Sequence, residues 1–268
     1  MLTSLILGAL VGAVLGLTGA GGGILAVPAL VVGMGWPIQQ ASPVALIAVA
    51  GSAAIGAVEA FRRGLVRYRA ALLMAVAGVP VTSLGASLAH KLPQRLLIEL
   101  FAGVMLLVAL RLLTQATGQK TPEQTMSPIC VGRVDPRTGR LAWTWATGAA
   151  LAGTGALTGL MTGLLGVGGG FVIVPILRKL TNVSMHGVVA TSLMVVALVG
   201  SGGVVSAMEA GASPPFMLTL LFSLTTVLGM IVGRAASRRL SARHVQIGFA
   251  GVLVCVSLGM VAKALLNG

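Results

Sequence analysis

The sequence predicts an all-α polytopic membrane protein made of two inverted repeats, each a glycine-broken helical hairpin followed by three transmembrane helices. Three observations lead to this fold class. Apolar residues make up 56% of the 268 residues and charged residues only 9%. A glycine-rich segment occurs twice, and the basic residues are unevenly divided between the loops. A composition this apolar along nearly the whole chain is typical of proteins with many membrane spans.

The duplicated segment covers residues 8–30 and 155–177. The two copies align at a constant offset of 147, and 13 of their 23 positions are identical, eight of them glycine or proline. Each copy contains a Gly-x-Gly-Gly-Gly run with a proline five residues later. Consecutive glycines interrupt a helix, so each copy predicts a broken helix inside an apolar region.

The first repeat is expected to span residues 1–113. Its broken region, 2–35, is followed by apolar runs near 43–61, 70–89 and 96–113. Each run is long enough to cross about 30 Å of hydrocarbon at about 1.5 Å per residue.

The polar residues 114–140 are rich in Pro, Thr, Gln and Arg, and predict a linker between the halves. The second repeat, 141–268, begins with a broken region at 141–177 and continues with apolar runs near 188–208, 215–233 and 245–266. The offset of 147 holds beyond the glycine segment, because Leu46 corresponds to Leu193 and Gly64 to Gly211.

The distribution of Lys and Arg distinguishes parallel from inverted repeats, because cytoplasmic loops are enriched in both residues. If each broken region crossed the membrane once, the basic residues would divide 8 to 10 between the two sides. If each broken region enters and returns as a hairpin, the division becomes 15 to 3, with only Lys91, Arg95 and Lys263 on the poor side. The hairpins invert the second half, and we expect a cytoplasmic linker with both termini periplasmic.

The helix breaks predict an anion site. A helix that stops and restarts leaves backbone N–H and C=O groups unpaired, and the restarted helix presents an N-terminus that carries roughly +0.5 of an elementary charge. Inversion would bring the two breaks together near the middle of the membrane. The candidate substrate-binding residues are Thr18, Gly21, Gly22, Gly23, Gly168, Gly169, Gly170, Thr191 and Ser192.

Several of these residues have a second interpretation. Thr18 can either line the site or bond a carbonyl one turn back, and Thr191 and Ser192 can either bind a solute or cap a helix start. The outer glycines recur at a spacing of four, which favours close helix packing over binding. They are Gly8, Gly12, Gly16, Gly155, Gly159 and Gly163.

Other functional classes find little support in the sequence. Glu59 can pair with Arg62 and Arg63 in an interfacial salt bridge. Glu99 lies one turn after Arg95 and Glu209 lies at the end of a span before Gly211, so neither of these two resembles a dedicated proton relay. The histidines lack the spacing of a metal site, and the glycine runs lack the Lys and Ser/Thr of a nucleotide-binding loop. We therefore expect no catalytic residues, no metal and no cofactor, and we do not expect an enzyme.

The paired Gly-x-Gly-Gly-Gly segments with their prolines, together with Thr191-Ser192, resemble the sulfite exporter TauE/SafE family, also called the toluene sulfonate uptake permease family. The resemblance covers essentially the full chain. It implies a bacterial inner-membrane carrier for small sulfur-containing anions. The first half departs from the pattern, with Val44-Ala45 in place of Thr191-Ser192, so we expect the two half-sites to bind a solute unequally.

These observations predict a secondary transporter that exports a small sulfur-containing anion, sulfite or an organosulfonate, by alternating access. An anion channel, or an importer of another small organic anion, remains the alternative. The expected partners are the small anion and the lipid bilayer, with no nucleic acid, and a homodimer is left open.

Overall fold

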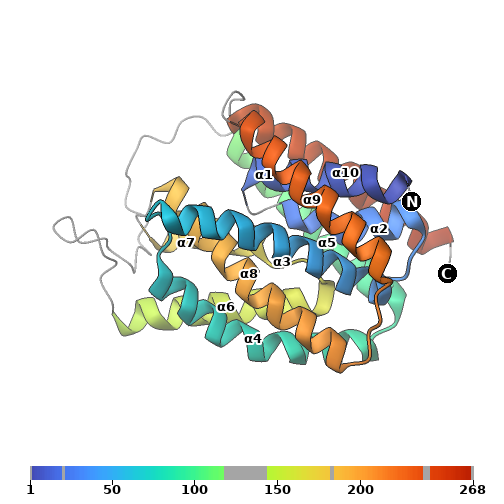
Figure 1. Cartoon of the computed structure of the whole chain (residues 1–268), viewed down its shortest axis with the longest axis horizontal. Helices are drawn as coiled ribbons and strands as arrows, with labels where there is room; N and C mark the ends of the chain where they lie inside the picture. The colour runs from blue at the N-terminus through green and yellow to red at the C-terminus, as the bar shows by residue number, and fades with distance from the viewer. Residues whose placement is uncertain (1, 20–21, 118–143, 182–183, 238–241, 267–268) are drawn as a thin grey trace.

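The computed structural model describes residues 2–19, 22–117, 144–181, 184–237 and 242–266 (Figure 1). This part of the chain contains ten α-helices, one 3₁₀ turn (η1) and no β-strand, so the predicted all-α class is confirmed. The first half contains α1 (Leu2–Thr18), η1 (Gly22–Leu25), α2 (Ala26–Met34), α3 (Ile38–Arg62), α4 (Tyr68–Lys91) and α5 (Gln94–Thr117). The second half contains α6 (Trp145–Leu165), α7 (Gly170–Leu180), α8 (Met185–Glu209), α9 (Phe216–Ser237) and α10 (Ala242–Leu266).

Seven of the described helices are long and apolar enough to cross a membrane. Six of them, α3, α4, α5, α8, α9 and α10, correspond to the six predicted apolar runs. The seventh is α6, the first arm of the second broken region, whereas its counterpart α1 has only 17 residues. The predicted linker begins within α5, which continues to Thr117, and most of it lies outside the described residues.

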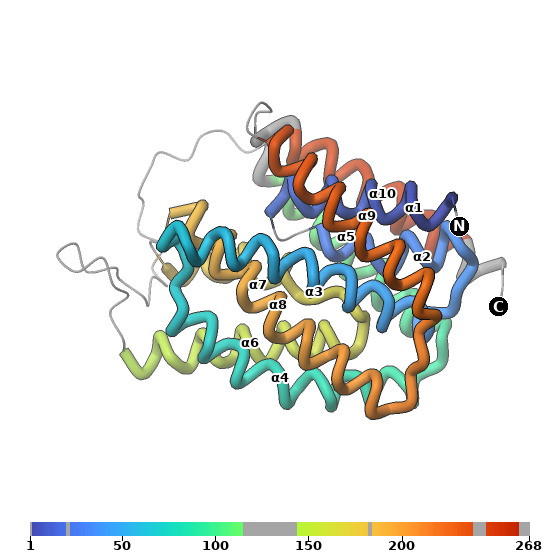
Figure 2. The backbone as a smooth tube through the Cα atoms, viewed as in Figure 1, coloured from blue at the N-terminus to red at the C-terminus, as the bar shows by residue number. Residues whose placement is uncertain are grey.

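Both broken regions form hairpins whose second arm turns back toward the end where the first arm began (Figure 2). We call the end where α5 finishes and α6 begins the linker end. The arms α1 and α2 start and finish at the opposite end, where α10 also finishes (Figure 1). The arms α6 and α7 start and finish at the linker end.

The two halves exchange their hairpin arms. The first arm of the first half, α1, packs along α9, and the first arm of the second half, α6, packs along α4. At the centre α3 lies against α8 and runs in the opposite direction, while α5 pairs with α10 (Figure 2). The central helices α3 and α8 are the most buried of the candidate spans. Each half therefore depends on the other for its packing.

The outer glycines make the exchanged packing possible. A Cβ at Gly12 would overlap the carbonyl of Thr226 on α9, and one at Gly159 would overlap the carbonyl of Gly78 on α4. Gly8 and Gly16 lie against α9 in the same way, and Gly155 and Gly163 lie against α4. The packing interpretation of these glycines agrees with the structure, because only a residue without a side chain allows the backbones this close.

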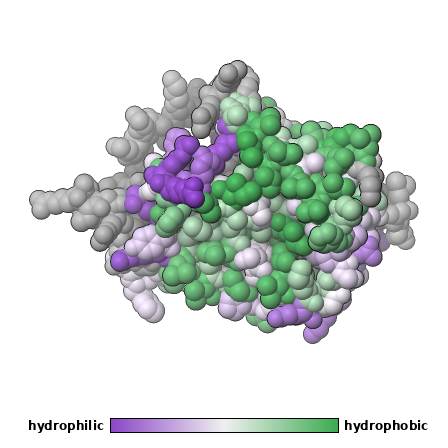
Figure 3. All heavy atoms as spheres, viewed as in Figure 1, coloured by the Kyte–Doolittle hydropathy of each residue, from purple (hydrophilic) through white to green (hydrophobic). Residues whose placement is uncertain are grey.

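Large apolar side chains cover much of the outer surface. On α4 the side chains of Leu72, Val76 and Leu84 are 59%, 65% and 66% exposed. Figure 3 shows hydrophobic residues over much of the viewed face, and the densest hydrophilic group lies toward the linker end. A surface this apolar is what contact with lipid requires, so the chain is a multi-pass membrane protein.

Candidate functional site

The first helix break follows α1. Gly19 has a left-handed φ of 84° and donates its N–H to the Leu15 carbonyl at 2.9 Å, which ends the helix. The chain resumes at Gly22 as a 3₁₀ turn and passes directly into α2. Gly22 and Gly23 are buried, and Gly22 lies against the backbone of Leu15. Gly21, a predicted site residue, lies outside the described residues.

The second break, between α6 and α7, has several left-handed residues. Gly166, Gly168 and Gly169 have φ values of 71°, 71° and 62°, so this loop has three left-handed residues. Helix α7 begins at Gly170, and the N–H groups of Val172 and Ile173 donate to the Gly169 carbonyl at 3.0 and 3.3 Å. The N–H groups of Gly170 and Phe171 come before these first helical hydrogen bonds, at the positive end of the helix dipole.

The two breaks meet in the middle of the molecule. A Cβ at Gly23 would lie 3.1 Å from the Val167 carbonyl oxygen and 3.0 Å from a methyl group of Val49 on α3. A Cβ at Gly168 would lie 3.3 Å from the same valine and 3.1 Å from Val196 on α8. Because Val49 and Val196 are separated by the repeat offset of 147, both breaks rest on equivalent points of the two central helices.

One face of α8 follows both breaks. Val189 contacts Gly19 of the first break, and Val196 contacts Gly168 of the second. Ser192 lies between them at helical spacing, one turn from each, and is therefore on the same face. On α3 the equivalent positions are Ser42, which contacts Gly166, and Ala45 and Val49. The predicted residue Ser192 is thus brought to the breaks.

Four buried hydroxyl oxygens have no hydrogen-bond partner among the described residues. One belongs to Ser223 on α9, a partly buried residue. The other three belong to Ser52 on α3, Thr158 on α6 and Ser192 on α8, and each of these residues is 0% exposed. The methyl group of Thr158 lies where a Cβ of Gly169 would be, so this residue is next to the second break. A buried hydroxyl without a partner costs about 1–3 kcal/mol, so these groups favour an added hydrogen-bonding species.

Ser52 and Thr158 were not among the predicted site residues. A signal was available in the register of the repeats, because Thr158 corresponds to Val11 and Ser52 to Val199. In both pairs a hydroxyl in one half replaces an apolar side chain in the other. Because the equivalent position in the other repeat is apolar, the fold itself does not require a hydroxyl there.

Thr18 and Thr191 have hydrogen-bonded roles in the backbone. The Thr18 hydroxyl donates to the Val14 carbonyl at 2.8 Å, the bond to the preceding turn that was one of its two interpretations. The Thr191 hydroxyl donates to the Gly187 carbonyl at 2.7 Å and accepts the backbone N–H of Arg67 at 3.1 Å. The capping interpretation of Thr191 and Ser192 is wrong, because α8 begins at Met185 and its cap is Ser184.

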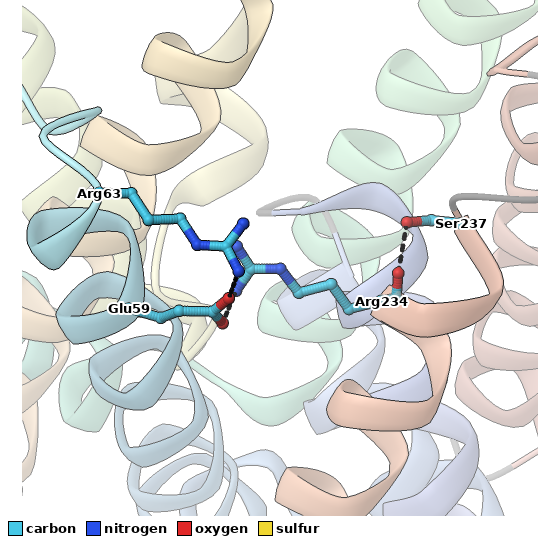
Figure 4. Close-up of polar contacts among 4 residues, drawn as sticks. All are labelled: Glu59, Arg63, Arg234 and Ser237. Atoms are coloured by element: carbon cyan, nitrogen blue, oxygen red, sulfur yellow. Dashed lines mark hydrogen bonds and ion pairs between the residues drawn. The ribbon is translucent and has the colours of Figure 1, made fainter.

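An ion-pair cluster joins the two halves at the linker end. The Glu59 carboxylate on α3 lies 2.7 Å from Arg63 and 2.8 Å from Arg234 on α9 (Figure 4). The pair with Arg63 was expected from helical spacing; no pair with Arg62 forms, and the bond to Arg234 was not foreseen because it links distant parts of the chain. The expected Arg95–Glu99 pair forms at 3.1 Å.

Two cavities lie at different ends of the second hairpin. The larger, about 40 Å³, lies near the start of α3, and its lining includes Gln39, Ser42, His90 and Gly163. The smaller, about 10 Å³, lies near the end of α7, and its lining includes Arg67, Thr181 and Thr191. Within the described ranges, no group of three or more His, Cys, Asp or Glu residues could hold a metal ion.

Comparison with known proteins gives the same assignment over almost the whole chain. Residues 4–260 match the sequence model of the sulfite exporter TauE/SafE family. A probable membrane transporter protein of Xylella fastidiosa strain Temecula1 is 30% identical over 254 residues, which cover 92% of this chain and 89% of the relative. A protein of the same description from strain 9a5c is 32% identical over 195 residues, 72% of this chain and 68% of the relative.

A more distant relative, a probable membrane transporter protein of Methanocaldococcus jannaschii, is 27% identical over 114 residues. This similarity covers 40% of this chain and 42% of the relative. No solved structure matches the chain.

Proposed function

Because the chain belongs to the sulfite exporter TauE/SafE family, we propose that it is a secondary transporter that exports a small sulfur-containing anion, sulfite or an organosulfonate, across the bacterial inner membrane by alternating access. Family membership and the names of the relatives support transport rather than catalysis as its activity.

The observation that carries the proposal is the group of unpartnered buried hydroxyls around the meeting helix breaks. Ser192 lies on the α8 face between the two breaks, and Thr158 lies beside Gly169 at the start of α7. An oxyanion accepts hydrogen bonds from hydroxyl and backbone N–H donors and is stabilised by the positive end of a helix dipole. In the proposed site, Gly22, Gly23, Gly168 to Gly170 and Thr18 form the backbone walls, and Ser192 and Thr158 donate to the anion.

The exchanged hairpins support inverted repeats in this proposal. The first hairpin enters and returns at one end of the bundle and the second at the other, while α3 and α8 cross in opposite directions (Figure 2). The basic residues Arg62, Arg63, Arg67, Arg69, Arg178 and Lys179 all lie at or near the linker end. By the positive-inside rule this end is cytoplasmic and the end where α1 begins is periplasmic.

The two ends differ in a way that suits alternating access. At the linker end the Glu59 ion pairs join the halves, and the cavity near Arg67 has room for about one water molecule. At the opposite end the cavity beside Ser42 is larger, and Ser42 contacts Gly166 of the second break. We assign this arrangement to a state closed toward the cytoplasm.

Export also agrees with the electrical driving force. A cell interior that is negative by 100 mV drives an anion outward by about 2.3 kcal/mol per charge. Within the described residues the carboxylates Glu59 and Glu99 are occupied in ion pairs at the helix ends. A carrier driven by the membrane potential and the substrate gradient therefore needs no proton relay.

The proposal is tested by reconstituting the purified protein into proteoliposomes and measuring uptake of [35S]sulfite, with labelled taurine and sulfoacetate as alternative substrates. We expect saturable uptake, accelerated by unlabelled anion on the far side, because a carrier exchanges one bound anion for another. The variant Thr158→Val should reduce uptake at least tenfold while keeping the native elution profile. If none of these anions shows saturable exchange, the proposal is contradicted. Uptake that is not accelerated by anion on the far side would favour the channel alternative.

A further inference from the structure

Arg67 has an unusual position among the basic residues at the linker end. It lies in the connection between α3 and α4 and is the N-terminal cap residue of α4. Its backbone N–H donates to the hydroxyl of Thr191 on α8 at 3.1 Å. Thr191 is 2% exposed and its own proton is used on the Gly187 carbonyl, so its orientation is fixed from both sides. The connection is therefore tied to the central helix of the other half.

The side chain of Arg67 has a buried donor with no acceptor. Its Nε atom is inaccessible to solvent and has no hydrogen-bond partner among the described residues. Arg63, Arg95 and Arg234, in contrast, each pair with a carboxylate. An unmet buried donor on a charged group costs more than one on a neutral group, and this cost is removed when the linker end opens and the donor reaches an anion.

A cavity with room for about one water molecule lies beside Arg67, and its accessible surface is apolar. Its lining includes Thr181 at the end of α7 and Thr191 on α8, together with apolar residues of α6 and α7. This cavity therefore lies at the base of the same hairpin whose glycine break carries Gly168 to Gly170. A guanidinium presents a planar fork of N–H donors that matches two oxygens of a sulfur oxyanion.

We propose that Arg67 is an anion-binding residue at the linker end of the transport route, and that Thr191 is the residue that positions it. This inference rests on the proposed function and adds a second contact for the same anion. In the state described here the cavity is nearly closed, and Arg67 receives the anion when the linker end opens. The role of Thr191, predicted as a binding residue, becomes that of holding the Arg67 backbone.

The test measures anion-dependent thermal stability of the purified protein in detergent. Sodium sulfite is titrated at constant ionic strength against sodium chloride, and the native protein is compared with Arg67→Gln and Arg69→Gln. Arg69 is the matched control, because it is a neighbouring arginine on α4 whose side chain is exposed. Its guanidinium carbon lies 5.9 Å from the ring centre of Tyr68. A ligand that binds only the folded state raises the melting temperature.

We expect sulfite to raise the melting temperature of the native protein and of Arg69→Gln, and not that of Arg67→Gln. If Arg67→Gln does not fold, Arg67→Lys serves instead. This variant keeps the positive charge but lacks the planar guanidinium, so half of the rise in melting temperature should require at least about fivefold more sulfite. No sulfite effect on the native protein, or an equal effect on the Arg67 variants, would overturn the inference.

The positioning role of Thr191 has its own comparison. Thr191→Val removes the acceptor for the Arg67 N–H and should raise the sulfite concentration that gives half of the rise in melting temperature. Thr191→Ser keeps a hydroxyl and should return this concentration to the native value. A residue that only fills space would be rescued by valine and not by serine. A protein stabilised by sulfite through Arg67 that does not transport sulfite would contradict the proposed function and leave the assignment of Arg67 intact.

Discussion

At the scale of single residues, the interior hydroxyls fall into two groups. Most, including those of Thr82, Thr162 and Thr226, donate to the carbonyl four residues earlier, the usual arrangement in an apolar helix. The hydroxyls of Ser52, Thr158, Ser192 and Ser223 do not, and the first three belong to fully buried residues. The sequence predicted Ser192 as a site residue but could not separate Thr158 from Thr162, because the side-chain rotamer decides which hydroxyl bonds its own helix.

Replacing Ser192 with alanine should separate binding from stability. The hydroxyl is buried and unpaired, so its removal should leave the melting temperature unchanged or slightly higher. If it donates to the transported anion, the KM for sulfite should rise about tenfold, equivalent to about 1.4 kcal/mol of lost binding. Both quantities are measured on the same purified protein, before and after reconstitution.

The control for this variant is Thr226→Val, which removes a buried hydroxyl that is already bonded within its helix at 2.6 Å. It should leave the KM within about twofold of the native value. An unchanged KM in Ser192→Ala, with normal folding, would remove Ser192 from the site.

At the scale of helices, the positions of the two interruptions were predictable and their conformations were not. The doubled Gly-x-Gly-Gly-Gly run fixes where each helix must stop, because consecutive glycines cannot sustain it. The first break has one described left-handed glycine, Gly19, and the second has three. The two breaks also have different neighbours, because Gly19 meets Val189 on α8 where the equivalent Gly166 meets Ser42 on α3.

The exchanged packing of α6 on α4 gives a prediction about glycine spacing. In Gly159→Ala the new methyl group would overlap the Gly78 backbone, so we expect a loss of about 1–3 kcal/mol of stability and a poor yield of folded protein. Gly153→Ala lies on the same helix with no atom near the new methyl, and should be neutral or stabilise by up to about 1 kcal/mol. Thermal unfolding in detergent compares them, and equal stabilities would contradict close packing at Gly159.

The Glu59 cluster links α3 to α9, so its removal should favour opening of the linker end. The carboxylate is 42% exposed, and we expect Glu59→Gln to cost less than about 1 kcal/mol of stability. In a background with Cys130→Ser and Cys255→Ser, the Thr181→Cys variant should react several-fold faster with a soluble maleimide when it also carries Glu59→Gln. Thr181 lines the cavity that opening would widen.

The matched control is Glu99→Gln, which breaks an exposed pair of the same i,i+4 type on α5. It should leave the reaction at position 181 unchanged. If Glu59→Gln leaves that rate unchanged as well, the ion pairs do not hold this end closed.

At the scale of the whole molecule, the sequence predicted the spans and the hairpins but not which helices pack together. Hydropathy and the glycine segments were sufficient for the helices, because each must satisfy its own backbone in lipid. The exchange of α1 and α6 between the halves depends on contacts across more than 70 residues of chain, as between Gly159 and Gly78. A single sequence does not encode that pairing in any local pattern.

The same exchange determines how a bound anion would contact the two halves. The first arms cross into the opposite halves and their breaks meet between α3 and α8, where two valines separated by the repeat offset support them. A single anion would then contact both halves, and its binding would depend on their relative position. This dependence is the physical requirement for alternating access at one site.

The most direct test is to locate the bound anion. Selenite has the charge and shape of sulfite, and its selenium atom gives an anomalous diffraction signal. In crystals of the protein grown with selenite, we predict a selenium peak between the two breaks, within hydrogen-bonding distance of the Ser192 or Thr158 hydroxyl and near the start of α7. A fully occupied selenium peak elsewhere in the protein, with none between the breaks, would contradict the account.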